Sequence, residues 1–199
     1  MSNSPPTTTF GKTQPSRFFS LARTSNAKGL PKSLTTLALV HNAGHPCPLR
    51  VIGRDDPVSF TKQAVRLNIL NAISFEGPTK KIQEAYQSSD LFVFPSLYDP
   101  FANVVLESLA CGLPALTTTT NGSSEIITQD TDRYVMKGAT DHLAKDLADR
   151  IQEFCKLSPD ERSMMRKAAI ERATAMSDGE SLFTSIKSPN LDAEKSKGV

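Results

Sequence analysis

Residues 90–120, DLFVFPSLYDPFANVVLESLACGLPALTTTT, decide the fold, because two short apolar runs flank a longer apolar segment. We expect Leu91 to Phe94 to form a strand, Phe101 to Cys111 a helix, and Pro114 to Thr118 a second strand. Short apolar strands separated by helices are typical of a parallel sheet that is covered on both faces. This stretch therefore predicts one strand–helix–strand unit of an α/β protein.

The same alternation continues on both sides of this unit. Further strands are expected at 18–22, 49–53, 72–75 and 134–136, and further helices at 30–43, 58–67, 79–88, 141–155 and 159–176. Together they predict an α/β fold with one doubly wound parallel sheet, in which ligands bind beyond the carboxyl ends of the strands. We expect 1–16 to be a flexible Pro/Ser/Thr-rich segment, 17–176 to be the domain and 177–199 to be a polar, disordered tail.

Composition indicates a cytoplasmic globular protein. Apolar residues make up 38% of the chain and charged residues 22%, and no apolar run approaches the ~20 residues that span a bilayer. The first twenty residues have no apolar signal-peptide core. Cys47, Cys111 and Cys155 are scattered and odd in number, which fits a reducing compartment better than a zinc site or a disulfide framework.

Charge is unevenly distributed along the chain. The first 66 residues hold nine Lys/Arg against two acids, a net +7, whereas the remaining residues hold fourteen against nineteen, a net −5. A basic half can attract phosphates, an anionic membrane surface or an acidic partner, and it can equally be a solvated face. Nucleic acid is not expected as a partner, because the bases are not interleaved with aromatic residues and the chain has no Trp.

Two carboxylates stand out in the opening stretch. Asp99 followed by Pro100 is a common helix start, so Asp99 is interpreted either as an N-cap or as a ligand contact. Glu107 lies within an otherwise apolar helix, where a buried carboxylate is costly unless it is hydrogen-bonded. Free backbone N–H groups and the positive end of the helix dipole would attract a phosphate. The candidate amides there belong to Ala102, Asn103 and Val104, and Glu107 could accept hydrogen bonds from two adjacent ribose hydroxyls.

Residues 90–127 resemble the donor-site signature of the retaining GT-B glycosyltransferases of family 4, especially bacterial lipopolysaccharide-core glucosyltransferases. The family pattern is a Glu-x7-Glu followed by an A-x-G-x-P-V strand and a G-G/S-x-x-E-I loop. Asp99 and Glu107 match the carboxylate pair, with Asp in place of the first Glu. The matches that follow are Ala110, Gly112, Pro114, Asn121, Gly122 and Glu125.

A second segment, FFSLARTSNAKGLPKSL (18–34), is similar to the family's F-x-G-R-x-x-x-x-K-G. Arg23 and Lys28 match the Arg and Lys that hold the donor diphosphate, and two cations in one turn suit that task. The loop that matches Phe75 to Pro78, with Gly77 in it, runs beside the nucleobase in the family. The whole resemblance covers about residues 17–175.

The resemblance implies a Rossmann-like domain that is the C-terminal, donor-binding half of a GT-B architecture, without the N-terminal acceptor domain. It implies hexosyl transfer, with glucose from UDP-glucose as the expected donor and a glycan or lipid-linked acceptor. No metal or cofactor is expected. Arg23, Lys28 and Asp99 would have catalytic roles, Asp99 would contact the sugar hydroxyls and Glu107 would hold the ribose.

Two alternatives remain open at this stage. The chain could be a truncated, non-catalytic nucleotide-sugar-binding protein, or the donor subunit of a two-chain enzyme whose acceptor domain is encoded separately. A lipid-linked acceptor would place the protein at the inner face of a membrane, as a peripheral protein.

Overall fold

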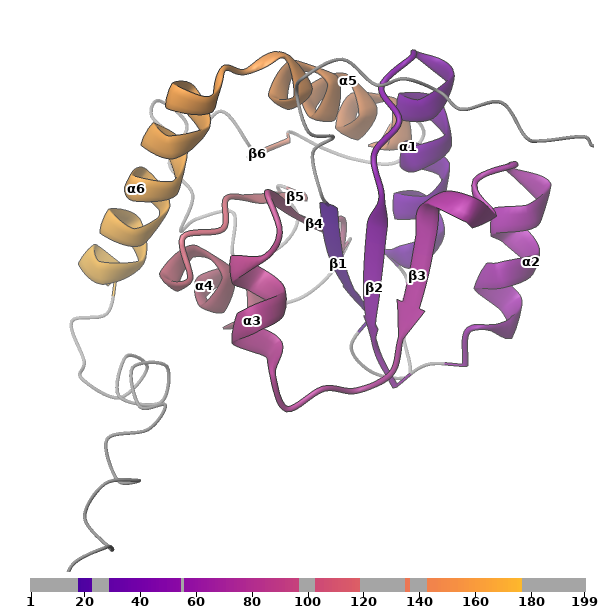
Figure 1. Cartoon of the computed structure of the whole chain (residues 1–199), viewed down its shortest axis with the longest axis horizontal. Coiled ribbons are helices and arrows are strands. Elements are labelled where there is room, and N and C mark those ends of the chain that lie inside the picture. The colour runs from indigo at the N-terminus through magenta and orange to yellow at the C-terminus, as the bar shows by residue number, and fades with distance from the viewer. Residues whose placement is uncertain are drawn as a thin grey trace, which may run out of the picture.

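The computed structural model describes residues 18–22, 29–54, 56–96, 103–118, 135–136 and 143–176, with backbone alone for 18–22 and 135–136. The described strands form one six-stranded sheet in the order β3-β2-β1-β4-β5-β6, and every pairing is parallel (Figure 1). The strands are β1 (Phe18–Ala22), β2 (Leu49–Gly53), β3 (Ile73–Glu76), β4 (Leu91–Phe94), β5 (Ala115–Thr118) and β6 (Val135–Met136). This is the doubly wound sheet that the alternation of strands and helices predicts.

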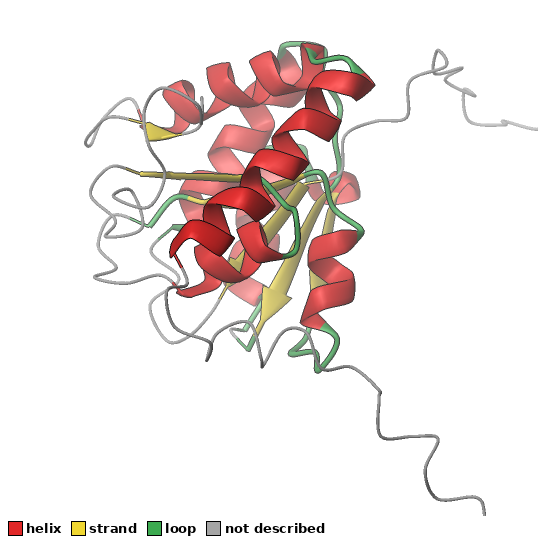
Figure 2. Ribbon diagram, turned by 90° about the vertical axis from the view of Figure 1, so that its left-hand side faces the viewer, coloured by secondary structure: helices red, strands yellow, loops and turns green. Residues whose placement is uncertain are grey.

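Helices cover both faces of this sheet (Figure 2). They are α1 (Leu30–Asn42), α2 (Val58–Arg66), α3 (Ile82–Gln87), α4 (Asn103–Ala110), α5 (Leu143–Lys156) and α6 (Pro159–Met176). Helices α1, α2 and α5 contribute to one apolar cluster with the sheet, and α3, α4 and α6 contribute to a second cluster on the other face. The sheet is therefore the middle of three layers.

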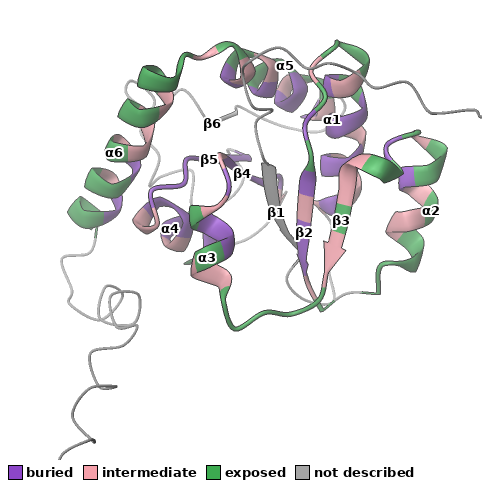
Figure 3. Cartoon of the chain, viewed as in Figure 1, coloured by how far each residue is buried: buried purple, intermediate pink, exposed green. Residues whose placement is uncertain are grey.

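Alternation along the strands assigns side chains to the two clusters. In β2, Val51 belongs to the cluster on the α1 side and Ile52 to the cluster on the α4 side. In β4, Val93 and Phe92 divide in the same way. Because successive strand residues point to opposite faces, a strand buried on both faces is apolar at most of its positions. Figure 3 shows the outer faces of α2 and α6 exposed, as expected for outer-layer helices.

A glycine ends α4. Gly112 has a φ of 71°, a left-handed conformation that favours glycine. Its N–H donates to Leu109 O at 2.9 Å and the N–H of Leu113 donates to Ser108 O at 2.8 Å, which is a Schellman motif. The chain then reverses through Pro114 into the buried strand β5.

The expected elements are confirmed, with small shifts at their ends. Helix α3 begins at Ile82 rather than at Thr79, because the Thr79 hydroxyl accepts the Lys81 N–H at 3.0 Å and holds a turn there. A short 3-10 helix at Leu70–Ala72 was not expected. None of the described helices is both long and apolar enough to cross a membrane. The division at residues 16 and 177 stays a prediction.

The connections change face between β1 and β4. These two strands are neighbours, yet α1 packs on one face and α4 on the other, so the topological switch point of the sheet lies at their carboxyl ends. Gly29 precedes α1, and a Cβ built on it would lie 2.8 Å from Pro95 O, just beyond β4. The absence of a side chain at Gly29 thus allows α1 to start against the end of β4.

Replacing Gly29 by Ala should lower the free energy of unfolding by about 1–3 kcal/mol, because backbone must move to make room for the methyl group. The φ of Gly29 is −83°, so the cost is steric rather than conformational. Urea unfolding would measure it, with Gly77→Ala as the matched control. A Cβ on Gly77 meets nothing within 4 Å, so this control should change stability by less than about 0.5 kcal/mol. Equal effects of the two substitutions would contradict this account of Gly29.

Candidate functional site

Four of the predicted site residues lie in the two connections that follow β1 and β4 in the sequence. Arg23 and Lys28 fall between β1 and α1, and Asp99 and Ala102 fall between β4 and α4. All four lie outside the described residues, so their roles stay predictions.

The described part of α4 begins at Asn103. Asn103 is exposed, whereas the Val104 side chain is buried in the cluster on the α4 side of the sheet. The structure therefore leaves Asn103 accessible at this end of the helix. Any contact of Val104 with a ligand would have to come from its backbone.

Glu107 lies one turn further along α4 and is half-buried. It shares a helix face with Cys111, as the spacing of four residues predicts. Burial raises the pKa of the Cys111 thiol, and the negative charge of Glu107 raises it further. Glu107 and Cys111 are both half-buried, so this side of α4 is neither fully buried nor fully exposed.

A protein partner for Glu107 comes from helix α3. The Tyr86 hydroxyl lies 3.3 Å from Glu107 Oε2 and 3.5 Å from Val104 O. A fully buried Glu107 would be hard to explain without a ligand. The side chain is only half-buried, however, and Tyr86 is within hydrogen-bonding distance of one of its oxygens, so Glu107 does not require a ligand.

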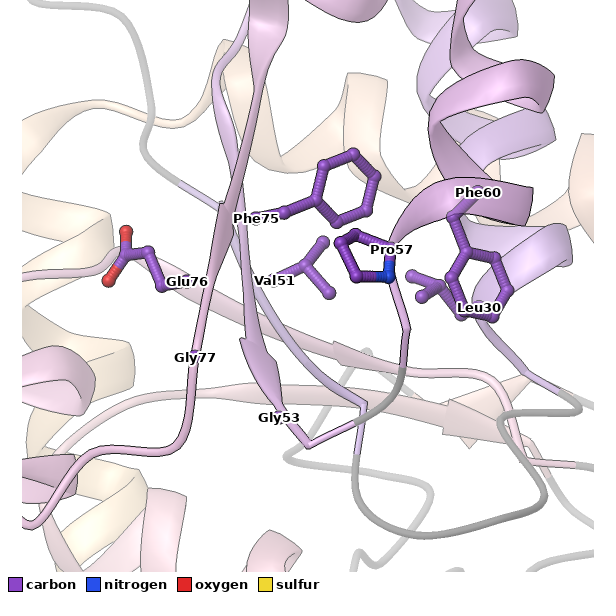
Figure 4. Close-up of a pocket in the computed structure, with 8 residues that line it drawn as sticks. All are labelled: Leu30, Val51, Gly53, Pro57, Phe60, Phe75, Glu76 and Gly77. Atoms are coloured by element: carbon purple, nitrogen blue, oxygen red, sulfur yellow. The ribbon is translucent and has the colours of Figure 1, made fainter.

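A pocket lies at the carboxyl ends of β2 and β3 (Figure 4). The empty space within it, including its open mouth, is about 360 Å³. Its lining residues are Leu30, Val51, Gly53, Pro57, Phe60, Phe75, Glu76 and Gly77. Phe75 and Gly77, which the resemblance places beside a nucleobase, thus both line one pocket.

The walls of this pocket are mainly apolar. Figure 4 shows Phe75, Val51 and Pro57 on one side of β3, together with Leu30 and Phe60, while the Glu76 carboxylate points to the other side. Gly77 leaves open space beside its backbone. An aromatic and aliphatic pocket with an accessible backbone suits a flat ring that is recognised through main-chain hydrogen bonds.

Glu76 binds Arg50 on the opposite face of the sheet. Arg50 Nε lies 2.8 Å from Glu76 Oε1, Arg50 Nη2 lies 2.8 Å from Oε2, and Arg50 Nη1 donates to Ser88 Oγ at 2.9 Å. This bidentate pair lowers the pKa of Glu76 and raises that of Arg50. It ties β2 to β3, the two strands that carry much of the pocket.

Sequence reasoning missed several residues of this region. Pro57, Phe60 and Leu30 line the pocket but come from segments distant from Phe75 in the sequence. Tyr86 could have been noticed as the single Tyr of its helix, but nothing in the sequence indicates that it faces Glu107. These contacts arise from the packing of elements.

Glu76→Gln should destabilise the protein at pH 7 by about 0.5–1 kcal/mol, because the pair is a third exposed and solvent screens it. The folded-state pKa of Glu76 lies below its ordinary value of 4.5. The stabilisation is therefore present above pH 4.5 and is lost as pH falls through the folded-state value. Urea unfolding of both proteins as a function of pH should show the gap closing in acid.

The matched control for this test is Glu84→Gln. Glu84 pairs with Lys81 at 3.1 Å, but both side chains are about two-thirds exposed or more. Its loss should change stability little at any pH. A Glu76→Gln gap that persists in acid would show that the carboxylate charge is not its cause.

Comparison with known proteins identifies the family. Residues 9–172 match the family described as glycosyl transferases group 1. The lipopolysaccharide glucosyltransferase WaaG of Escherichia coli (strain K12) is 31% identical over 101 residues, which are 50% of this chain and 27% of that protein. The match thus covers about a quarter of the length of this relative.

Solved structures share the fold. A crystal structure of WaaG matches with a TM-score of 0.70 and 24% identity, over 87% of this chain and 45% of that one. The pneumococcal O-GlcNAc transferase GtfA, solved in complex with UDP and GlcNAc, matches with a TM-score of 0.67 and 15% identity, over 81% and 32%. Since the family match covers most of the sequence and the sheet has the expected architecture, the chain belongs to the group 1 glycosyl transferases.

Proposed function

We propose that this chain is the nucleotide-sugar donor-binding domain of a retaining glycosyltransferase, which transfers a hexosyl group from UDP-glucose to a glycan or lipid-linked acceptor. The observation that carries the proposal is Glu107, a half-buried carboxylate near the start of α4. It lies in the motif that resembles the family's donor site. A carboxylate can accept hydrogen bonds from two adjacent hydroxyls, so the Glu107 side chain suits a ribose.

The pocket supports a nucleotide as the ligand. Its apolar walls, Phe75 and Phe60 among them, suit the faces of a nucleobase, and the open backbone at Gly77 suits the base edge. The pocket lies at the carboxyl ends of β2 and β3, where doubly wound sheets bind ligands. The UDP in the GtfA structure is consistent with this choice of nucleotide.

The proposed chemistry depends on charge. When the bond between sugar and diphosphate breaks, negative charge grows on the diphosphate. Arg23 and Lys28 would stabilise this charge in the transition state, so no metal is required. Asp99 would hold the sugar hydroxyls. The acceptor would attack from the face that the diphosphate leaves, which retains the anomeric configuration.

An acceptor site would come from a second domain. The WaaG structure is more than twice as long as the part that this chain matches. We therefore propose that catalysis requires an acceptor domain beside the donor domain, in the same polypeptide or as a separate subunit. A chain that binds the nucleotide but never joins such a domain would be a binding protein only.

Calorimetric titration of the 199-residue chain with UDP tests the proposal. We expect micromolar binding, and Lys28→Ala and Glu107→Ala should each weaken it about tenfold, the effect of losing one charge-assisted hydrogen bond. Lys167→Ala, which removes an exposed cation on α6, is the matched control and should bind as the wild type does.

The nucleotide preference of the wild type tests the donor site and the choice of nucleotide separately. Failure of the folded chain to bind UDP, GDP and ADP would contradict a donor site. Tighter binding of GDP or ADP than of UDP would keep the donor site but overturn the choice of nucleotide.

Phe60→Ala tests the pocket as the base subsite. Removing an aromatic wall should weaken UDP binding about fivefold or more, because base–aromatic contacts are worth about 1–3 kcal/mol. Inorganic pyrophosphate, which has no base, should bind equally to wild type and variant. Equal loss for both ligands would indicate that Phe60 acts on the domain as a whole.

A further inference from the structure

We infer that Tyr86 is a positioning residue for Glu107. Tyr86 holds one carboxylate oxygen of Glu107, so that the other oxygen can accept hydrogen bonds from the ribose hydroxyls of the donor. This inference rests on the proposed function and adds a residue to which the family resemblance assigns no role. It is drawn from the contact between α3 and α4. The residue touches the proposed ligand only through Glu107.

Tyr86 is itself firmly held. Its side chain is 1% exposed, and its ring packs edge-on against Phe92 of β4, with ring centroids 5.8 Å apart and an interplanar angle of 80°. Edge-to-face packing of this kind is favourable for aromatic pairs. Because the ring is buried between α3 and the sheet, its hydroxyl has a fixed position at the side of α4.

The hydroxyl carries a single proton, and two acceptors lie within hydrogen-bonding distance of it among the described residues. Val104 O is 3.5 Å away and belongs to a helix, in which carbonyls already accept backbone N–H groups. Glu107 Oε2 is closer, at 3.3 Å, and carries negative charge. A hydrogen bond to a charged acceptor is stronger than one to a neutral carbonyl, so the carboxylate is the preferred partner.

This contact would restrict the Glu107 side chain before a ligand arrives. A half-buried glutamate otherwise samples several rotamers, and ordering them on binding would cost affinity. A hydrogen bond from an immobile donor removes part of that cost in advance. Among the described residues, the donor that contacts Glu107 does so at Oε2, which leaves Oε1 for the ligand.

The test compares UDP with 2′,3′-dideoxy-UDP, a ligand without the ribose hydroxyls, by calorimetry on the 199-residue chain. Tyr86→Phe removes the hydroxyl and keeps the ring against Phe92. We expect it to weaken UDP binding roughly five- to tenfold. It should leave binding of the dideoxy nucleotide within about twofold, because that ligand gains nothing from an ordered Glu107. The ratio of the two affinities does not depend on the folded fraction, since both ligands meet the same protein.

Two further proteins separate positioning from packing. In the Glu107→Ala background, Tyr86→Phe should cause no additional loss of UDP affinity, because the residue through which Tyr86 acts is gone. Thr36→Val is the matched control: Thr36 is buried and donates to Ala144 O at 3.3 Å on the other face of the sheet. It should leave both affinities unchanged even if it lowers stability.

The outcomes separate the inference about Tyr86 from the proposed function on which it rests. If the wild type binds UDP and Glu107→Ala weakens binding, an unchanged affinity in Tyr86→Phe overturns the inference alone. Equal losses for UDP and the dideoxy nucleotide, or additive losses with Glu107→Ala, also overturn it, since they indicate a packing role. If the folded wild type binds no nucleoside diphosphate, the proposed function fails and the inference fails with it.

Discussion

The close approach of α1 to the end of β4 is the constraint on which the rest of the structure depends. Gly29 packs against the carbonyl of Pro95 because it has no side chain, and this contact lies where the two central strands, β1 and β4, send their connections to opposite faces. A doubly wound sheet must have such a point, and the crevice there is its usual ligand site. Both connections that contain the predicted diphosphate and sugar contacts begin at this place.

The Glu107 carboxylate in α4 can have a structural role and a functional role at the same time. Tyr86 offers Glu107 a hydrogen bond, so the side chain can exist in the folded protein without a ligand. The same contact orients the carboxylate, which is what a ribose site requires. A fully buried and fully satisfied glutamate would be purely structural, and a fully exposed one would be mobile. Glu107 is half-buried, a position that combines order with access.

Much of the fold could be predicted because its signals are local. The apolar runs of β4 and β5, the helical stretches between strands and the glycine of the Schellman motif each depend on a few adjacent residues. The candidate site was predicted in part, through Glu107, Phe75 and Gly77, on the strength of motif resemblance. The start of α3 was misplaced because a hydroxyl-bonded turn at Thr79 competes with helix formation. Four residues of the predicted site lie outside the described residues, so their roles stay predictions: Arg23, Lys28, Asp99 and Ala102.

The sequence by itself determined the α/β class, the order of the elements and the family, because hydrophobic periodicity and motifs depend on residues that are close together in the sequence. Only the tertiary structure decided which distant segments meet. It placed Tyr86 against Glu107, 21 residues away, and assembled the pocket from α1, β2, α2 and β3. The packing of helices on a twisted sheet determines which of these residues come into contact. The sequence around each residue does not indicate its partner. That is why the polar cost of Glu107 could be seen in the sequence, whereas the residue that offsets it could not.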